Sequence, residues 1–165
     1  MQIKRLLRHL MTPDWMARRA FPPDVLISIE RAIAESERGH EGELRFAVEA
    51  GLPMAALLRD ESARARAIEA FSALHVWDTA HDSGVLIYVQ LVDRKMEIVA
   101  DRGINARVGQ EQWDAICRKM ELAFRAGDFA AGALAAIAEI NTLLCRHFPA
   151  SGVNPNELPD RPVIL

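Results

Sequence analysis

The sequence GVLIYVQLVDRKMEIVADRG, residues 84–103, decides the fold of this chain. An unbroken apolar run covers residues 84–92, a polar break follows at residues 93–95, and residues 96–103 return with apolar and polar side chains in alternation. This pattern predicts a buried strand, a tight turn and an antiparallel return strand. Antiparallel pairing places the end of the return strand beside the loop that precedes Gly84. The residues expected to meet there are Asp101, Arg102 and Gly103 from one side and Asp78, Thr79, His81 and Asp82 from the other.

A second strand is predicted at residues 43–50, where apolar and charged side chains alternate in the sequence ELRFAVEA. The period of two predicts a half-buried strand. A helix is predicted from about residue 60, and a strand–helix–strand crossover makes the two strands parallel. Both strands then begin at the same edge of the sheet, so that residues 40–43, 78–82 and 101–103 converge. We call this edge the acidic rim.

Helical periodicity predicts further helices at residues 22–39, 109–126 and 128–147, and Trp77 and Trp113 are expected to pack in the core. The expected fold is an α/β domain whose small mixed β-sheet, a parallel crossover plus an antiparallel hairpin, is flanked by helices. This domain is expected to span residues 21–149. Residues 150–165 contain three prolines and predict an extended tail, which either straps onto the domain or binds a partner.

Composition and charge exclude several classes of protein. Half of the 165 residues are hydrophobic, which is enough for one domain with a substantial core. The formal net charge of -3 and the few aromatic residues argue against nucleic-acid binding. No apolar run approaches the roughly 20 residues that cross a bilayer, and no signal-peptide pattern is visible at the N-terminus. We therefore expect a cytoplasmic protein, in which the isolated Cys117 and Cys145 are reduced core thiols.

Several segments together resemble the TPM domain family. They are HEGELRFAVE at 40–49, VWDT at 76–79, GVLIYV at 84–89, DRKMEIVADRGI at 93–104 and NELPDRPVIL at 156–165. The resemblance implies an α/β fold with a small mixed sheet between helices. It also implies divalent cation binding, which is associated with some members, and the family is often labelled a phosphatase without a settled biochemical role. The export signal and C-terminal membrane anchor of better-known members are not expected here.

The acidic rim is the candidate functional site. Its carboxylates are of the type that hard cations such as Mg²⁺ or Ca²⁺ prefer, and His40 and His81 would widen the choice to Mn²⁺ or Zn²⁺. The candidate metal ligands are Glu41, Glu43, Asp78, Asp82 and Asp101. The alternative interpretation is that these acids are solvated or paired with nearby arginines, which requires no metal.

Two functions remain open at this rim. A metal-dependent phosphatase would use a bound cation to polarise a phosphate ester and to activate water, with Asp78, Asp101 and Arg102 as the candidate catalytic residues. A noncatalytic cytoplasmic binding module or adaptor would instead use the rim, the tail or the N-terminal segment to hold a partner. The adaptor is slightly favoured, because no nucleophile–base pair is recognisable and Thr79 is better explained as a hydroxyl that caps the loop.

The first twenty residues form a basic amphipathic segment. Its cationic residues are Lys4, Arg5, Arg8, Arg18 and Arg19, and they flank apolar residues such as Leu7 and Trp15. Such a segment can lie on an anionic membrane or dock an unknown protein partner. The alternative is a helix that packs on its own domain.

Overall fold

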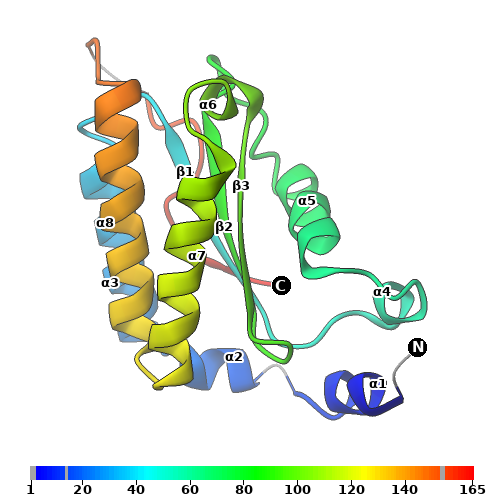
Figure 1. Cartoon of the computed structure of the whole chain (residues 1–165). Coiled ribbons are helices and arrows are strands. Elements are labelled where there is room, and N and C mark those ends of the chain that lie inside the picture. The colour runs from blue at the N-terminus through cyan, green and yellow to red at the C-terminus, as the bar shows by residue number, and fades with distance from the viewer. Residues whose placement is uncertain (1–2, 14, 153–154) are drawn as a thin grey trace.

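A four-stranded mixed sheet forms the centre of the protein in the computed structural model, which describes residues 3–13, 15–152 and 155–165 (Figure 1). The strand order is β3-β2-β1-β4. Strand β1 (Glu43–Glu49) runs parallel to β2 (Gly84–Gln90), and β2 pairs with β3 (Lys95–Ala100) in antiparallel register. Strand β4 (Val163–Ile164) adds to the free edge of β1 in parallel. The predicted α/β fold with a mixed sheet is confirmed.

The register brings the expected strand ends to one edge of the sheet. Glu43 pairs with Gly84, so β1 and β2 begin together, and Val85 pairs with Ala100, so β3 ends beside the start of β2. The amide of Asp101 donates to the carbonyl oxygen of Gly84 at 2.8 Å, which extends this pairing by one residue. The strand directions that define the acidic rim are therefore those predicted from the sequence.

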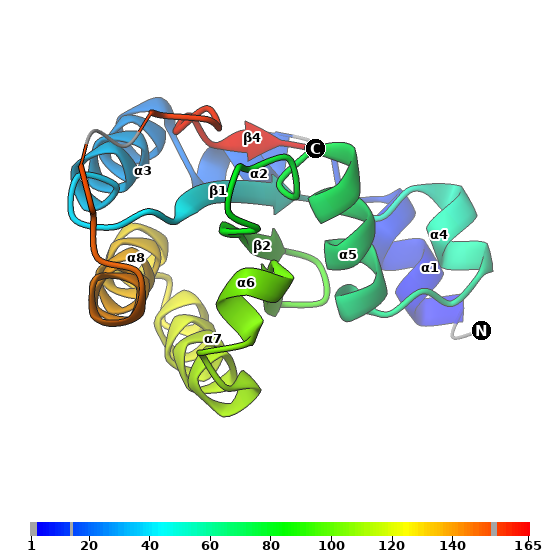
Figure 2. The ribbon, with the colours of Figure 1, turned by 90° about the horizontal axis from the view of Figure 1, so that it is seen from above.

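Helices cover both faces of the sheet (Figure 2). Three long helices lie on one face: α3 (Pro23–Ser36), α7 (Gln110–Arg125) and α8 (Phe129–His147). On the other face lies α5 (Ala63–Ala73), with the short α4 (Met54–Leu58) beyond it. The single-turn α6 (Arg102–Asn105) follows β3 at the acidic rim, whereas α1 (Ile3–Leu10) and α2 (Trp15–Ala20) lie at the opposite end (Figure 1).

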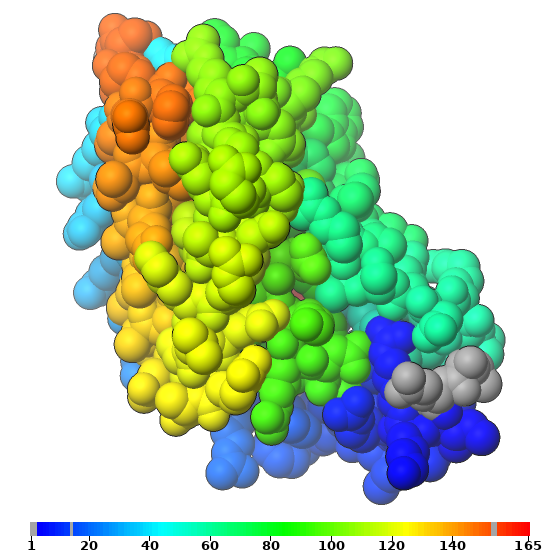
Figure 3. Space-filling view, in the orientation of Figure 1, coloured from blue at the N-terminus to red at the C-terminus, as the bar shows by residue number. Residues whose placement is uncertain are grey.

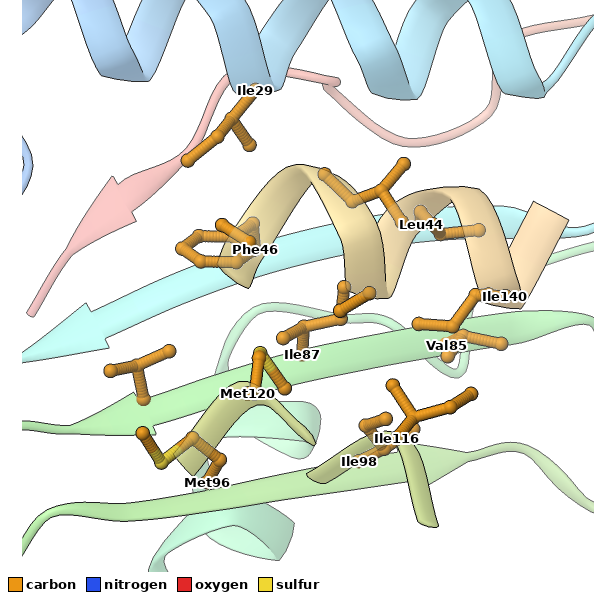
Figure 4. Packing of buried hydrophobic residues seen from close by; sticks show 14 of the residues in the cluster. Ile29, Leu44, Phe46, Val85, Ile87, Met96, Ile98, Ile116, Met120 and Ile140 are labelled. Atoms are coloured by element: carbon orange, nitrogen blue, oxygen red, sulfur yellow. The ribbon is translucent and has the colours of Figure 1, made fainter. Parts of the chain in front are cut away.

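The main core lies between the sheet and the three long helices. Helix α7 contributes apolar side chains three or four residues apart, which places them on one face. They meet Ile87, Ile98 and Ile140, as the close-up of the core shows (Figure 4). Helix α8 is long and apolar enough to cross a membrane by length and composition alone. Its face that includes Ile137, Ile140 and Leu144 is part of this core, as expected for the central helix of a globular domain.

Strand β1 differs from its prediction because its charged face is not in solvent. All seven of its residues are buried. Helix α5 and the C-terminal tail cover the second face, and the charged side chains find polar partners there. Glu43 accepts hydrogen bonds from the amides of Glu157 and Leu158, at 3.2 and 3.0 Å. Arg45 donates to the carbonyl oxygen of Pro159 and, at 3.1 Å, to that of Arg161.

The two tryptophans assigned to the core have different environments. Trp113 is 1% exposed and belongs to the main core, as predicted. Trp77 is 50% exposed, so its predicted core position is wrong. It lies in the turn after α5, next to the buried Val76, and contacts only the ring of His75 among aromatic side chains of the described residues. The chain buries Val76 at this point and leaves the larger indole in solvent.

Candidate functional site

The loop before β2 and the residues after β3 meet closely at the acidic rim. A Cβ atom on Gly103 would lie 2.6 Å from the carbonyl oxygen of Asp82 and 2.7 Å from that of His81. These distances are shorter than any normal contact, so only glycine permits this approach of the two backbones. The predicted convergence of residues 78–82 with residues 101–103 is thus achieved by backbone contact.

The two carboxylate oxygens of Asp101 differ in their hydrogen bonding. As the residue that precedes α6, it accepts a hydrogen bond from the Arg102 amide through Oδ1, at 2.7 Å. Its Oδ2 is buried and has no hydrogen-bond partner among the described residues. A buried carboxylate oxygen without a donor is unfavourable, because it has lost water and gained nothing in exchange. Among the described residues of the rim, Oε1 of Glu43 is a second buried oxygen without a donor.

Asp82 and Arg102 form an ion pair across the rim. Arg102 Nε lies 3.0 Å from Asp82 Oδ2, and the two side chains are 83% and 43% exposed. The hydrogen bond to Asp82, helped by the charges of Asp82 and Asp101, raises the pKa of Arg102. Because the guanidinium is in solvent, its attraction to the carboxylates is screened by water and salt. Arg102 is therefore a mobile counter-charge for the two acids.

The loop before β2 is held by its own hydroxyl group. Thr79 Oγ1 accepts a hydrogen bond from the Ser83 amide at 2.9 Å. This contact confirms that Thr79 caps the loop. Asp78 and His81 are exposed, and no described side chain donates to the Asp78 carboxylate. At the end of the loop Asp82 has a φ of 51°, in the left-handed region, where aspartate is one of the few residues tolerated.

The remaining two candidates, Glu41 and Glu43, are engaged by the tail. The hydroxyl of Ser151 donates to Glu41 Oε1. Glu43 is 1% exposed, and this burial raises its pKa. The hydrogen bonds that it accepts from the amides of Glu157 and Leu158 act in the opposite direction, but the effect of burial is larger. The tail also reaches the loop of Asp82, because the Ala80 amide donates to Glu157 at 2.8 Å.

A second acidic group, not predicted from the sequence, surrounds Glu43. Glu37 follows α3 and accepts a hydrogen bond from the Leu44 amide at 2.8 Å. Burial, with the nearby charges of Glu43 and Asp160, raises the pKa of Glu37 to about 9. Burial likewise lowers the pKa of His40, to about 4. The acidic residues Glu157 and Asp160 of the tail were the only hint of this group in the sequence. The sequence did not predict where on the sheet the tail would pack, so the group could not be assembled from it.

The structure therefore divides the five candidate ligands into three settings. Asp82 and Asp101 lie beside Arg102, Glu41 and Glu43 hold the tail, and Asp78 is in solvent. Within residues 3–13, 15–152 and 155–165, no group of three or more His, Cys, Asp or Glu side chains is arranged to hold a metal ion. Mg²⁺ keeps several of its waters and is commonly bound through only one or two carboxylates, so a larger cluster is not a requirement for this ion.

Comparison with known proteins decides the family. The family model described as the TPM domain matches residues 19–143, most of the chain. The chain belongs to the TPM domain family. Among solved structures, the BA42 protein of the psychrophilic bacterium Bizionia argentinensis is similar in fold, with a TM-score of 0.75. It is 28% identical in sequence, and the match covers 86% of this chain and 93% of that one. No curated protein matches.

The largest hollow of this TPM domain, about 680 Å³, lies at α2 and the start of α8, away from the acidic rim, whereas a hollow of about 390 Å³ is lined by Glu37, Arg38 and Asp160, close to Glu43. A cavity of about 350 Å³ lies at the carboxyl end of β2 and the start of β3 and is lined by residues that include Met16, Met96 and Phe124. That end of a parallel sheet is where α/β proteins usually bind ligands. Of five hollows among the described residues, none is lined by Asp78, Asp82 or Asp101.

Both cysteines of the TPM domain are free thiols, and burial raises the pKa of Cys117 to about 12.

Proposed function

We propose that this TPM-domain protein is a noncatalytic binding module whose acidic rim takes up a divalent cation, Mg²⁺ or Ca²⁺, through Asp82 and Asp101. The observation that carries the proposal is the buried Oδ2 of Asp101, which lacks a donor and lies on the residue next to Arg102. A cation would satisfy this oxygen and replace the guanidinium as the counter-charge of Asp82. The site then becomes a cation-dependent surface for a partner.

The surroundings of the rim support binding rather than chemistry. Thr79, the hydroxyl of this loop, is used as a backbone cap. A cation at Asp82 would also stiffen the loop to which Glu157 attaches the tail. Cation binding would thereby couple the loop and the tail, the two segments most available to a protein partner. The cytoplasmic location of the protein stays a prediction of the sequence.

Titration of the full chain with Mg²⁺ and Ca²⁺ by isothermal calorimetry tests the site. Asp101→Asn keeps an oxygen to cap α6 but removes the charge, and we expect it to weaken cation binding by about tenfold or more. Arg102→Gln is expected to have the opposite effect, because the cation no longer competes with the guanidinium for Asp82.

Asp128→Asn is the matched control for this titration. Asp128 is an exposed acid at the α7–α8 turn, at the other end of the molecule, and its substitution should leave cation affinity unchanged. Equal cation affinity of the wild-type protein and the Asp101→Asn variant would reject the site. Weaker cation binding by the Arg102→Gln variant than by the wild-type protein would also reject the site, because the arginine would then favour cation binding instead of competing with it.

A metal-dependent phosphatase at the same rim is the second candidate function, and the exposed Arg102 is the observation that favours it. Its planar guanidinium is free enough to hold the non-bridging oxygens of a phosphate ester. A bound divalent cation would supply polarisation of the phosphoryl group and activation of water. Asp101 would help to hold that cation, and the exposed Asp78 would take the proton from the attacking water.

Hydrolysis of a chromogenic phosphate monoester separates the two functions. For the binding module we expect no hydrolysis above the level of buffer with the same Mg²⁺ or Mn²⁺ concentration. Cation-dependent turnover that is lost in the Asp101→Asn and Arg102→Gln variants, but retained by Asp128→Asn, would establish the phosphatase instead. Turnover that survives both rim substitutions would remove the rim from any catalytic role.

A further inference from the structure

Helix α1 lies on the domain mainly through polar side chains, and of its apolar residues Leu6 packs inward, against the small cluster of Leu52, Ala56 and Leu57. Arg5 donates to Asp93 Oδ2 through Nε at 3.0 Å and pairs with Asp60 at 3.1 Å. His9, only 3% exposed, lies 3.1 Å from Asp93 Oδ1 through Nε2 and accepts the Leu52 amide through Nδ1 at 2.9 Å. A helix that docks on its own domain to hide apolar surface would show the reverse orientation.

The apolar side of α1 faces solvent instead. Ile3, Leu7 and Leu10 are 68%, 52% and 52% exposed, and Met11, the residue that follows α1 and donates its amide to the Leu7 carbonyl oxygen, is 79% exposed. Positions 3, 7, 10 and 11 share one face of a helix, so these side chains form a continuous stripe. The polar anchors hold the helix, and with it the stripe, in this orientation.

Helix α2 extends this surface toward the middle of the molecule. Trp15 is 56% exposed and Met16 is 39% exposed. Together with Ala20, Val25 and Phe129 they line an open hollow of about 680 Å³ that continues to the start of α8. In Figure 3, α1, α2, the β2–β3 turn and the α7–α8 turn all lie at the same end of the molecule. We call the exposed residues of α1 and α2 the N-terminal surface.

The charges of the N-terminal surface identify its partner. Lys4, Arg8, Arg18 and Arg19 are exposed, and Asp14 is the one acidic residue in the first twenty residues of the sequence. These cations stand out because the chain as a whole carries a formal net charge of -3. Apolar side chains, an exposed tryptophan and flanking Lys and Arg are the combination that binds the interface of an anionic lipid layer.

We propose that the N-terminal surface binds anionic lipid membranes peripherally. The stripe of α1 and the side chains of Trp15 and Met16 enter the boundary between headgroups and acyl chains, while the four cations contact lipid phosphates. The domain is thereby oriented with its N-terminal surface on the membrane. The acidic rim, at the opposite end of the sheet, faces away from the negatively charged lipid (Figure 1).

Sedimentation of the full chain with vesicles tests this proposal. Two vesicle compositions are compared: phosphatidylcholine alone, and phosphatidylcholine with roughly one-third phosphatidylglycerol. Because each Lys or Arg near an anionic surface adds to the attraction, we expect at least about tenfold tighter binding to the anionic vesicles, and weaker binding as salt is added. The double substitution Leu7→Glu with Met11→Glu should reduce the binding by about tenfold or more.

Two comparisons make the result specific. Ile68→Glu on α5 is compared with Leu7→Glu alone, because each adds one negative charge at a side chain of similar exposure, 48% and 52%, and Ile68→Glu should bind as the wild-type protein does. In a Trp77→Phe variant, Trp113 is buried and Trp15 is the remaining exposed tryptophan of the described residues. Its emission should shift to shorter wavelength on anionic vesicles and be quenched by brominated lipid.

Several outcomes would overturn the proposal. They are equal affinity for both vesicle compositions, no sedimentation with either, or wild-type binding by the Leu7→Glu, Met11→Glu variant. A surface that captures a protein partner but no vesicle would also contradict it. Circular dichroism should show the same unfolding midpoint for this variant and for Ile68→Glu, because the substituted side chains are exposed. Cation binding at the acidic rim does not enter this test, so the two proposals stand or fall separately.

Discussion

Replacement of Glu49 by alanine is expected to lower the free energy of unfolding by about 3–5 kcal/mol, because it removes one partner of a buried ion pair. Glu49 lies on β1 and is 2% exposed. Arg66 of α5 donates to its carboxylate through Nε and Nη2, with the shortest distance 2.7 Å, and the hydroxyl of Tyr88 donates to Oε2. Without the carboxylate, the fully buried Tyr88 hydroxyl loses its acceptor, and the guanidinium of Arg66 keeps only the more exposed Glu69, at 2.8 Å.

The Lys119–Glu139 pair provides the control for this prediction. Its shortest distance is also 2.7 Å, but the two side chains are 65% and 39% exposed. Glu139→Ala should therefore cost less than about 1 kcal/mol in the same urea unfolding experiment, followed by far-ultraviolet circular dichroism. Glu49→Gln keeps an acceptor oxygen and should fall between the two. If Glu49→Ala costs no more than Glu139→Ala, the buried network does not hold α5 on the sheet.

The central hairpin and the long helices could be predicted because their signals are local. The apolar run at residues 84–92 and the return at 96–103 define strands without reference to any distant segment. The helices expected at 109–126 and 128–147 occur as α7 and α8, with every boundary within one residue of the expected position. The direction of the strands follows from the crossover, and with it the meeting of Asp82 and Asp101.

The environment of β1 could not be predicted, because alternation of apolar and charged residues is the same whether the charged face is wet or covered. The covering groups come from distant segments: Arg66 is 17 residues away from Glu49, and Leu158 is 115 residues away from Glu43. Strand β4 could not be predicted either, because its two residues form a strand only by pairing with the edge of the distant β1. Single-turn α6 is too short for a periodic signal.

The orientation of α1 was open for a related reason. Its apolar and basic residues predict an amphipathic helix, and in most surface helices the apolar side packs on the domain. The polar side is inward here because Asp93 and Asp60 lie where Arg5 and His9 can reach them. Those acids are in the β2–β3 turn and after α4, so no local pattern contains the information. The N-terminal surface is thus a product of tertiary contacts.

Replacement of Glu37 by glutamine is expected to make the protein more stable than wild type at alkaline pH. In the folded state burial raises the pKa of Glu37 to about 9, from an ordinary value of 4.5. Between these two values the folded protein keeps a proton that the unfolded chain has lost, so wild-type stability decreases as the pH rises. Glutamine resembles the protonated acid, and its oxygen can still accept the Leu44 amide. The stability of Glu37→Gln relative to wild type should therefore increase by about 2 kcal/mol between about pH 7 and about pH 8.5.

Urea unfolding of both proteins over this range measures the difference, and Glu35→Gln is the matched control. Glu35 lies in the last turn of α3, two residues before Glu37, and is exposed, so its substitution should leave the pH dependence of stability unchanged. The range stays above pH 6.5 because of His40, whose pKa is lowered from an ordinary 6.5 to about 4 in the folded protein. Between pH 4 and pH 6.5 this shift makes stability increase with pH, which is opposite to the effect of Glu37. Parallel pH profiles of wild type and Glu37→Gln would mean that Glu37 is ionised in the folded protein.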